Sequence, residues 1–90
     1  MKLIGRKILA NADITVPARR RLALWAKQIT EADWDSLTSA TIGFPQARTI
    51  NGCRVVFPFA QFGLTVTALL SFEMGIVYVE EVVELDIEAR

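Results

Sequence analysis

Hydrophobic and polar residues alternate most regularly between residues 54 and 83. Three runs rich in Val, Phe, Leu and Thr are separated by Gln61-Phe62-Gly63 and by Glu73-Met74-Gly75. β-branched and aromatic residues favour a pleated, half-buried strand, and each break contains the glycine that a tight turn uses. The pattern therefore predicts a three-stranded antiparallel meander around which the rest of the chain is organised.

The middle run of this meander fixes the orientation of the predicted sheet. Its apolar positions are spaced by two and share one face, which we expect to be the core: Leu64, Val66, Ala68, Leu70 and Phe72. The residues between them are less hydrophobic, so a binding or catalytic surface would have to lie on the opposite face. A two-residue turn at Glu73-Met74 would pair Leu70 with Val77. A three-residue turn with Gly75 in a left-handed bulge would shift this register, and we prefer the first turn because it pairs apolar with apolar residues.

A helical period appears before the meander. Between Pro17 and about Glu31, apolar residues recur at spacings of four, three and four, which places them in one stripe along a helix: Ala18, Leu22, Trp25 and Ile29. Thr15 is a suitable N-cap for this helix, and Pro17 stands early, where a missing amide proton costs little. The sequence therefore predicts one amphipathic helix with an apolar stripe available to the core.

Shorter elements complete the expected order. We expect a strand over residues 2–4, a helix over 6–12, a helix over 37–42 and an edge strand over 47–50. Asn51-Gly52 is a strong hairpin signal and would join this edge strand to the meander. Helices and strands of this size predict a single α+β domain over residues 1–90.

The composition excludes several kinds of site. The chain has no histidine, which removes the commonest general base and the commonest metal ligand. Cys53 is its single cysteine, so a disulfide framework and a thiolate zinc site within the chain are excluded. No phosphate-binding loop or dinucleotide fingerprint occurs. We therefore expect no metal and no cofactor.

Charge is balanced overall but unevenly distributed. Residues 1–54 carry nine Lys and Arg against four Asp and Glu, a net charge of +5, whereas residues 55–90 carry one Arg against six acids, a net charge of −5. The basic half could contact phosphate, or the two halves could attract each other. Arg19-Arg20-Arg21 also has two possible roles. A basic cluster near a helix N-terminus is mildly unfavourable with the helix dipole, so these arginines could be kept for a partner. They could instead pair with the acidic C-terminal half.

Neither the first residues nor the longest apolar region of the chain predicts a segment that enters a membrane. Charges interrupt the first residues too early for a secretion signal, and the apolar region 55–72 is broken by Pro58, Gln61 and Gly63. We expect a soluble cytoplasmic protein without a membrane partner.

Short motifs follow one another in a specific order: Met1-Lys2-Leu3-Ile4 with Arg6-Lys7, Leu24-Trp25 with Lys27, Ala32-Asp33-Trp34-Asp35-Ser36, Phe44-Pro45-Gln46-Ala47, Arg54-Val55-Val56-Phe57 and Ile76-Val77-Tyr78-Val79. This order resembles the HigB family of bacterial toxins, within the RelE-like superfamily, over nearly the whole chain. The resemblance implies a RelE-like α+β fold, with N-terminal helices packed on a three- to four-stranded antiparallel sheet. It also implies a ribosome-associated mRNA endonuclease that is neutralised by a helix-turn-helix antitoxin.

The resemblance implies a site on the open face of the sheet. Arg54 matches the family and is the candidate catalytic residue, which could grip a phosphate with its bidentate fork; a salt bridge at the start of the strand is the alternative role. The candidate RNA-binding residues are basic positions of the N-terminal half: Arg6, Lys7, Arg19, Arg20 and Lys27.

The chain departs from the family at most catalytic positions. Thr65 and Leu69 stand where the family has basic residues, and Glu80 stands where it has an arginine. The family's C-terminal His, Tyr and Asp region falls on Leu85, Glu88 and Ala89. The resulting face is nearly neutral to acidic, and Glu80 would repel RNA.

Three hypotheses follow from these residues. The first is a HigB-type toxin, active or weakly active. The second is a RelE-like fold that has lost catalysis and binds a partner such as an antitoxin. The third is a small α+β domain that forms a homodimer through exposed apolar surface around Leu69 and Val82.

Overall fold

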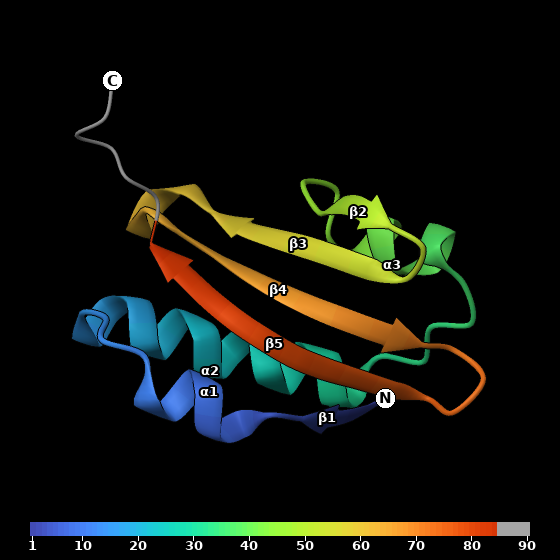
Figure 1. Cartoon of the computed structure of the whole chain (residues 1–90), viewed down its shortest axis with the longest axis horizontal. Helices are drawn as coiled ribbons and strands as arrows, with labels where there is room; N and C mark the ends of the chain where they lie inside the picture. Colours follow the sequence, from blue (N-terminus) through green and yellow to red (C-terminus); the bar gives the residue numbers. More distant parts are fainter. Residues whose placement is uncertain (85–90) are drawn as a thin grey trace.

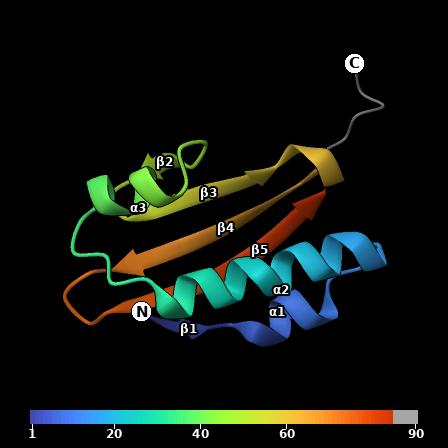
Figure 2. The same cartoon turned by 180° about the vertical axis from the view of Figure 1, so that it is seen from behind.

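Helices cover one face of a five-stranded sheet and leave the other face open (Figures 1 and 2). The computed structural model describes residues 1–84. Its elements are, in chain order, β1 (Lys2–Ile4), α1 (Arg6–Asn11), α2 (Val16–Glu31), α3 (Leu37–Gly43), β2 (Arg48–Asn51), β3 (Arg54–Phe59), the 3-10 turn η1 (Ala60–Phe62), β4 (Leu64–Ser71) and β5 (Ile76–Glu84). The predicted α+β class is confirmed.

The sheet is mixed and not antiparallel throughout. Its strand order is β1-β5-β4-β3-β2, and the strands from β2 to β5 are antiparallel neighbours, as the meander predicted. β1, however, joins parallel to β5, with Leu3 opposite Val77. Parallel pairing needs a long crossover instead of a tight turn, and here all three helices and three strands lie between the two partners. The expected three- to four-stranded antiparallel sheet is therefore corrected to a five-stranded mixed sheet.

The turn between β4 and β5 has the predicted register. Leu70 lies opposite Val77, and Gly75 closes the turn with a left-handed φ of 69°. Further along, the register shifts between Thr67 and Ala68, and Thr67 pairs with Glu81. Such a bulge adds one residue to β5 and changes which side chains of that strand reach each face.

Helix α2 supplies the main apolar stripe of the core. Thr15 caps it by accepting a hydrogen bond from the amide of Ala18 (3.3 Å). The predicted stripe is confirmed, since all four of its residues are buried: Ala18, Leu22, Trp25 and Ile29. The predicted helix over 37–42 is found as α3, capped by Ser36, whose hydroxyl accepts from the amide of Ser39.

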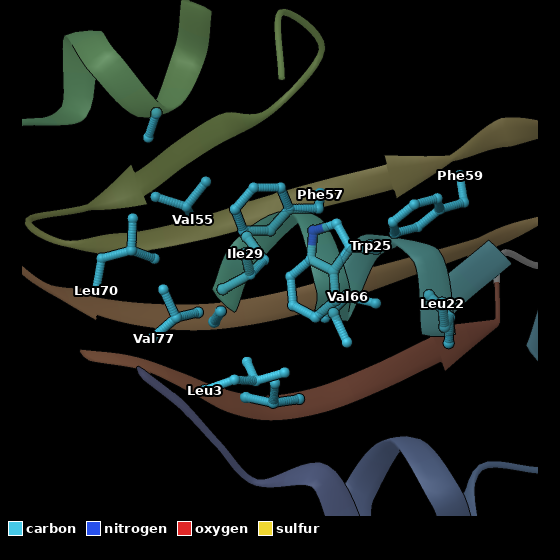
Figure 3. Close-up of a cluster of buried hydrophobic side chains, with 14 of the residues drawn as sticks. Leu3, Leu22, Trp25, Ile29, Val55, Phe57, Phe59, Val66, Leu70 and Val77 are labelled. Atoms are coloured by element: carbon cyan, nitrogen blue, oxygen red, sulfur yellow. The ribbon is translucent and has the colours of Figure 1, made fainter. Parts of the chain in front are cut away.

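Trp25 occupies the centre of the core between α2 and the sheet (Figure 3). Its ring is fully buried and meets Phe57 edge-on at a centroid distance of 5.3 Å and Phe59 at 6.4 Å. These pairs add directional packing to the burial of three large rings. The contact packs α2 against the face of the sheet that carries Phe57 and Phe59, and the opposite face is left uncovered.

Gly5 permits a close approach between the β1–α1 turn and β5. Its φ of 96° lies in the left-handed region. A Cβ at this position would stand 2.7 Å from the carbonyl oxygen of Val79, closer than side chains and backbone approach each other. Glycine is therefore required for α1 to pack against β5.

None of the helices in residues 1–84 combines the length and the apolar character needed to cross a membrane.

Candidate functional site

The open face of the sheet carries two shallow hollows. One has a volume of about 460 Å³ and is lined by Ile50, Arg54, Thr67, Glu80 and Glu81, from strands β2 to β5. The other, of about 560 Å³, lies toward the 3-10 turn and includes Arg48, Val56 and Thr65 in its wall. Strand periodicity places these residues on the side opposite the core, and the bulge on β5 allows the consecutive Glu80 and Glu81 to face the same side. The face opposite the core is therefore hollowed and open to solvent.

An ion pair between Arg54 and Glu80 crosses this face. The guanidinium donates from Nε to Oε1 of Glu80 at 2.6 Å and from Nη2 to Oε2 at 3.1 Å, which is a bidentate geometry. Arg54 starts β3 and Glu80 lies on β5, so the pair bridges over β4, the strand between them. It is the single side-chain salt bridge found among the side chains of residues 1–83.

The ion pair fixes the protonation states of both side chains. The hydrogen bond from Arg54 holds the pKa of Glu80 below its usual value, more strongly than partial burial raises it. The same hydrogen bond raises the pKa of Arg54. Glu80 is consequently a carboxylate at neutral pH and a poor general acid. Of the two roles open to Arg54, the structure shows the salt bridge at the start of the strand.

The predicted RNA-binding residues lie on the helices, away from Arg54 on β3. Arg6 and Lys7 are on α1, whereas Arg19, Arg20 and Lys27 are on α2, and all five are exposed. None of them lines either hollow of the open face. The structure therefore does not bring the predicted catalytic and RNA-binding residues together.

Arg19 has a structural partner. Its Nη1 and Nη2 donate to the carbonyl oxygens of Ala10 (2.8 Å) and Ala12 (2.9 Å), at the C-terminal end of α1. A cation there satisfies free carbonyls and complements the helix dipole. The side chain joins α1 to α2, a role that the sequence pattern did not reveal.

The open face of the sheet also carries exposed apolar side chains. Ile50, Leu69, Tyr78 and Val83 expose 56%, 43%, 47% and 41% of their surface. Leu69 lies opposite both Arg54 on β3 and Tyr78 on β5, so it borders the ion pair directly. The open face thus carries these apolar side chains together with the Arg54–Glu80 ion pair and two further charged residues, Arg48 and Glu81.

The expected apolar surface around Leu69 and Val82 needs one correction. Val82 packs against the core and Val83 is the exposed residue. The cause is the bulge on β5, because one extra residue reverses the alternation that the sequence pattern assumed. Strict period-two counting through residue 83 could not have found it.

The remaining positions of interest complete the picture. Thr65 and Leu69, where the family resemblance implies cations, lie on the open face, and Leu69 is 43% exposed. Leu85, Glu88 and Ala89 lie outside the residues that the structure describes. Among the described residues, no three Asp, Glu or Cys side chains gather into a metal-binding group.

Neither a protein-family model nor a curated protein matches this chain.

Proposed function

We propose that this chain is a RelE-like binding module, a catalytically weakened relative of HigB-type toxins. Its open sheet face would bind a partner protein of the helix-turn-helix antitoxin kind. The observation that carries the proposal is the bidentate ion pair between Arg54 and Glu80. The cation that would contact a scissile phosphate already has an anionic partner.

The charge of the hollow that contains Arg54 supports a protein partner over RNA. Its lining contains one cation, Arg54, and two acids, Glu80 and Glu81, which gives a local net charge of −1. Binding to a nucleic acid depends on an excess of Lys and Arg that replaces counterions along the phosphates. Cleavage further needs cations or donors where charge develops on the phosphoryl oxygens. The hollow provides neither in excess.

The apolar residues of the face suit a protein interface. Protein interfaces have apolar and aromatic centres that exclude water, often with an arginine among them. Leu69 and Tyr78 are paired across β4 and β5, and Ile50 lies on the edge strand β2, on the far side of β3. A helix or an extended segment of a partner laid across these strands would bury all three residues.

The first experiment separates a binding module from an active toxin. Wild-type protein and the Arg54→Ala variant are induced separately in bacteria, and growth is followed together with the integrity of cellular mRNA. We expect no growth arrest and no mRNA cleavage from either protein. Growth arrest by the wild type that disappears in Arg54→Ala would refute the proposal, because it would show that Arg54 acts in an enzyme.

The second experiment tests the binding face. The chain is co-expressed with a helix-turn-helix protein encoded by an adjacent gene, and the complex is measured by co-purification and by calorimetry. We expect Leu69→Arg to weaken binding at least 100-fold, since it buries an unpaired charge in the interface. Leu24→Arg is the matched control, because Leu24 is similarly exposed (51%) but lies on α2. Equal losses in the two variants would remove the open face from the interface.

A further inference from the structure

The hairpin between β2 and β3 exposes an asparagine that is followed by glycine. Asn51 is the last residue of β2, Gly52 and Cys53 form the two-residue turn, and all three are exposed. Gly52 stands at the first turn position with a φ of 52°, a conformation for which hairpins use glycine. A Cβ built there would meet nothing within 4 Å, so the space around the Asn51–Gly52 peptide bond is open.

The amide nitrogen of Gly52 is free to act as a nucleophile. It makes no backbone hydrogen bond in the part of the chain that the structure describes. Asparagine is chemically labile because its side-chain carbonyl can be attacked by the next backbone nitrogen, which closes a five-membered ring. Glycine lacks the side chain that would hinder this approach. The Asn51–Gly52 pair is therefore well suited to cyclisation.

The end of β2 can rearrange at small cost. All four residues of β2 are exposed, and the strand lies at the edge of the sheet (Figure 1). Its ladder with β3 is irregular between Thr49 and Asn51, and Asn51 itself pairs with Arg54. Local opening of such an exposed segment needs little free energy. The backbone rotation that cyclisation requires is thus accessible in the folded protein.

A negative charge formed at Asn51 would lie beside Arg54. The two residues are directly opposite each other on β2 and β3, and such pairs project from the same face with Cβ atoms about 4.5–5.5 Å apart. The bonds from Arg54 to Glu80 use Nε and Nη2. A guanidinium has further N–H donors on Nη1, so Arg54 can serve a second carboxylate without releasing the first.

We propose that Asn51 deamidates spontaneously in the folded protein and that the aspartate formed becomes a second partner of Arg54. The Gly52 nitrogen bonds to Cγ of Asn51, its proton is lost, and the side-chain nitrogen leaves as ammonia. Water then opens the succinimide ring: cleavage at Cγ gives aspartate, and cleavage at the backbone carbonyl gives isoaspartate. A neutral amide is thereby exchanged for a carboxylate, which makes the open face more acidic. This proposal does not rest on the binding function proposed above.

Mass spectrometry of the aged, unmodified protein tests the reaction. Trypsin places the two asparagines of the chain in separate peptides, residues 49–54 with Asn51 and residues 8–19 with Asn11, which alanine follows. At mildly alkaline pH we expect aspartate and isoaspartate to form at Asn51 at least roughly tenfold faster than at Asn11, and within about tenfold of the rate in the free peptide 49–54. An unaged sample digested in the same way corrects for reaction during digestion.

Two results would overturn the proposed reaction. Equal rates at Asn51 and Asn11 would show that the hairpin glycine does not favour cyclisation. A rate at Asn51 more than about tenfold below that of the free peptide would show that the fold protects this residue. The Asn51→Gln variant is the control, since it keeps an amide but would have to close a larger ring, and its peptide 49–54 should remain unmodified.

A second set of variants tests whether the new carboxylate reaches Arg54. Asn51→Asp supplies the aspartate product directly. Glu80→Gln removes the carboxylate bonded to Arg54, so it should lower the urea midpoint less in the Asn51→Asp background than in the wild type. Thr49→Asp is the matched control, because Thr49 is exposed on the same strand but lies opposite the core residue Val55, and there the effect of Glu80→Gln should be unchanged. Equal effects of Glu80→Gln in the wild type and in Asn51→Asp would refute the pairing with Arg54.

Discussion

Substitution of Gly5 by alanine tests how closely α1 must approach β5. Two separate costs are expected. The first is conformational, because φ at Gly5 is 96° and an L-residue in the left-handed region loses about 1–2 kcal/mol. The second is steric, because the new Cβ would lie 2.7 Å from the carbonyl oxygen of Val79. Val79 is a fully buried residue of the central part of β5 and cannot move without disturbing the core.

The steric cost can be isolated with Gly75→Ala. Gly75 also has a positive φ, of 69°, but nothing lies within 4 Å of a Cβ built there. Gly75→Ala should therefore show the conformational cost alone, about 1–2 kcal/mol. Gly5→Ala should add the cost of forcing extra volume into a packed site, about 1–3 kcal/mol. We thus expect a total loss of about 2–5 kcal/mol in the free energy of unfolding for Gly5→Ala.

Urea denaturation followed by circular dichroism measures both variants. At a slope of about 1 kcal/mol per M for a chain of this size, the midpoint of Gly5→Ala should lie about 1–3 M below that of Gly75→Ala. If the two variants unfold at the same urea concentration, the close contact between the β1–α1 turn and Val79 does not exist and the packing of α1 described above is wrong.

Three further predictions concern the ion pair, a helix cap and the core. Because the hydrogen bond from Arg54 lowers the pKa of Glu80, its stabilising effect is present above the usual value of 4.5 and is lost as the pH falls through the lowered value. Glu80→Gln should therefore be less stable than the wild type at pH 7, with a difference that shrinks toward pH 3; a difference independent of pH would contradict this linkage. Thr15→Ala removes the acceptor for the amide of Ala18 and should cost about 1 kcal/mol, seen as a lower melting temperature by roughly 4–8 °C. Trp25→Ala should cost about 3–5 kcal/mol in urea unfolding, and a loss below 1 kcal/mol would show that the ring is not enclosed.

Local patterns in the sequence predicted the elements that depend on neighbouring residues. The register at Leu70 and Val77 follows from alternation and from one short turn, and both are visible over about ten residues. The stripe of α2 and its cap at Thr15 follow from spacings of three and four and from the preference of hydroxyl groups for N-caps.

Features that depend on distant parts of the chain were missed. The parallel pairing of β1 with β5 has no short-range signal, since it depends on how the helices cross the sheet. The bulge on β5 also lacks a glycine that would mark it, and it exchanged the environments of Val82 and Val83. At the site, the sequence could identify Arg54 as important but left its partner open. The partner became clear only once β3 and β5 were placed on either side of β4.

The pairing of β1 with β5 has a consequence for how the chain folds. Leu3 and Val77 are 74 positions apart, and such distant contacts slow folding because a large loop must be ordered before they form. At synthesis rates of about 5–20 residues per second, β1 would wait roughly 4–15 seconds for its partner strand to be made. Until then, the outer edge of β4 is also unpaired and open to other chains. The first and last strands therefore act together as a late closing step that protects the nascent protein from misassembly.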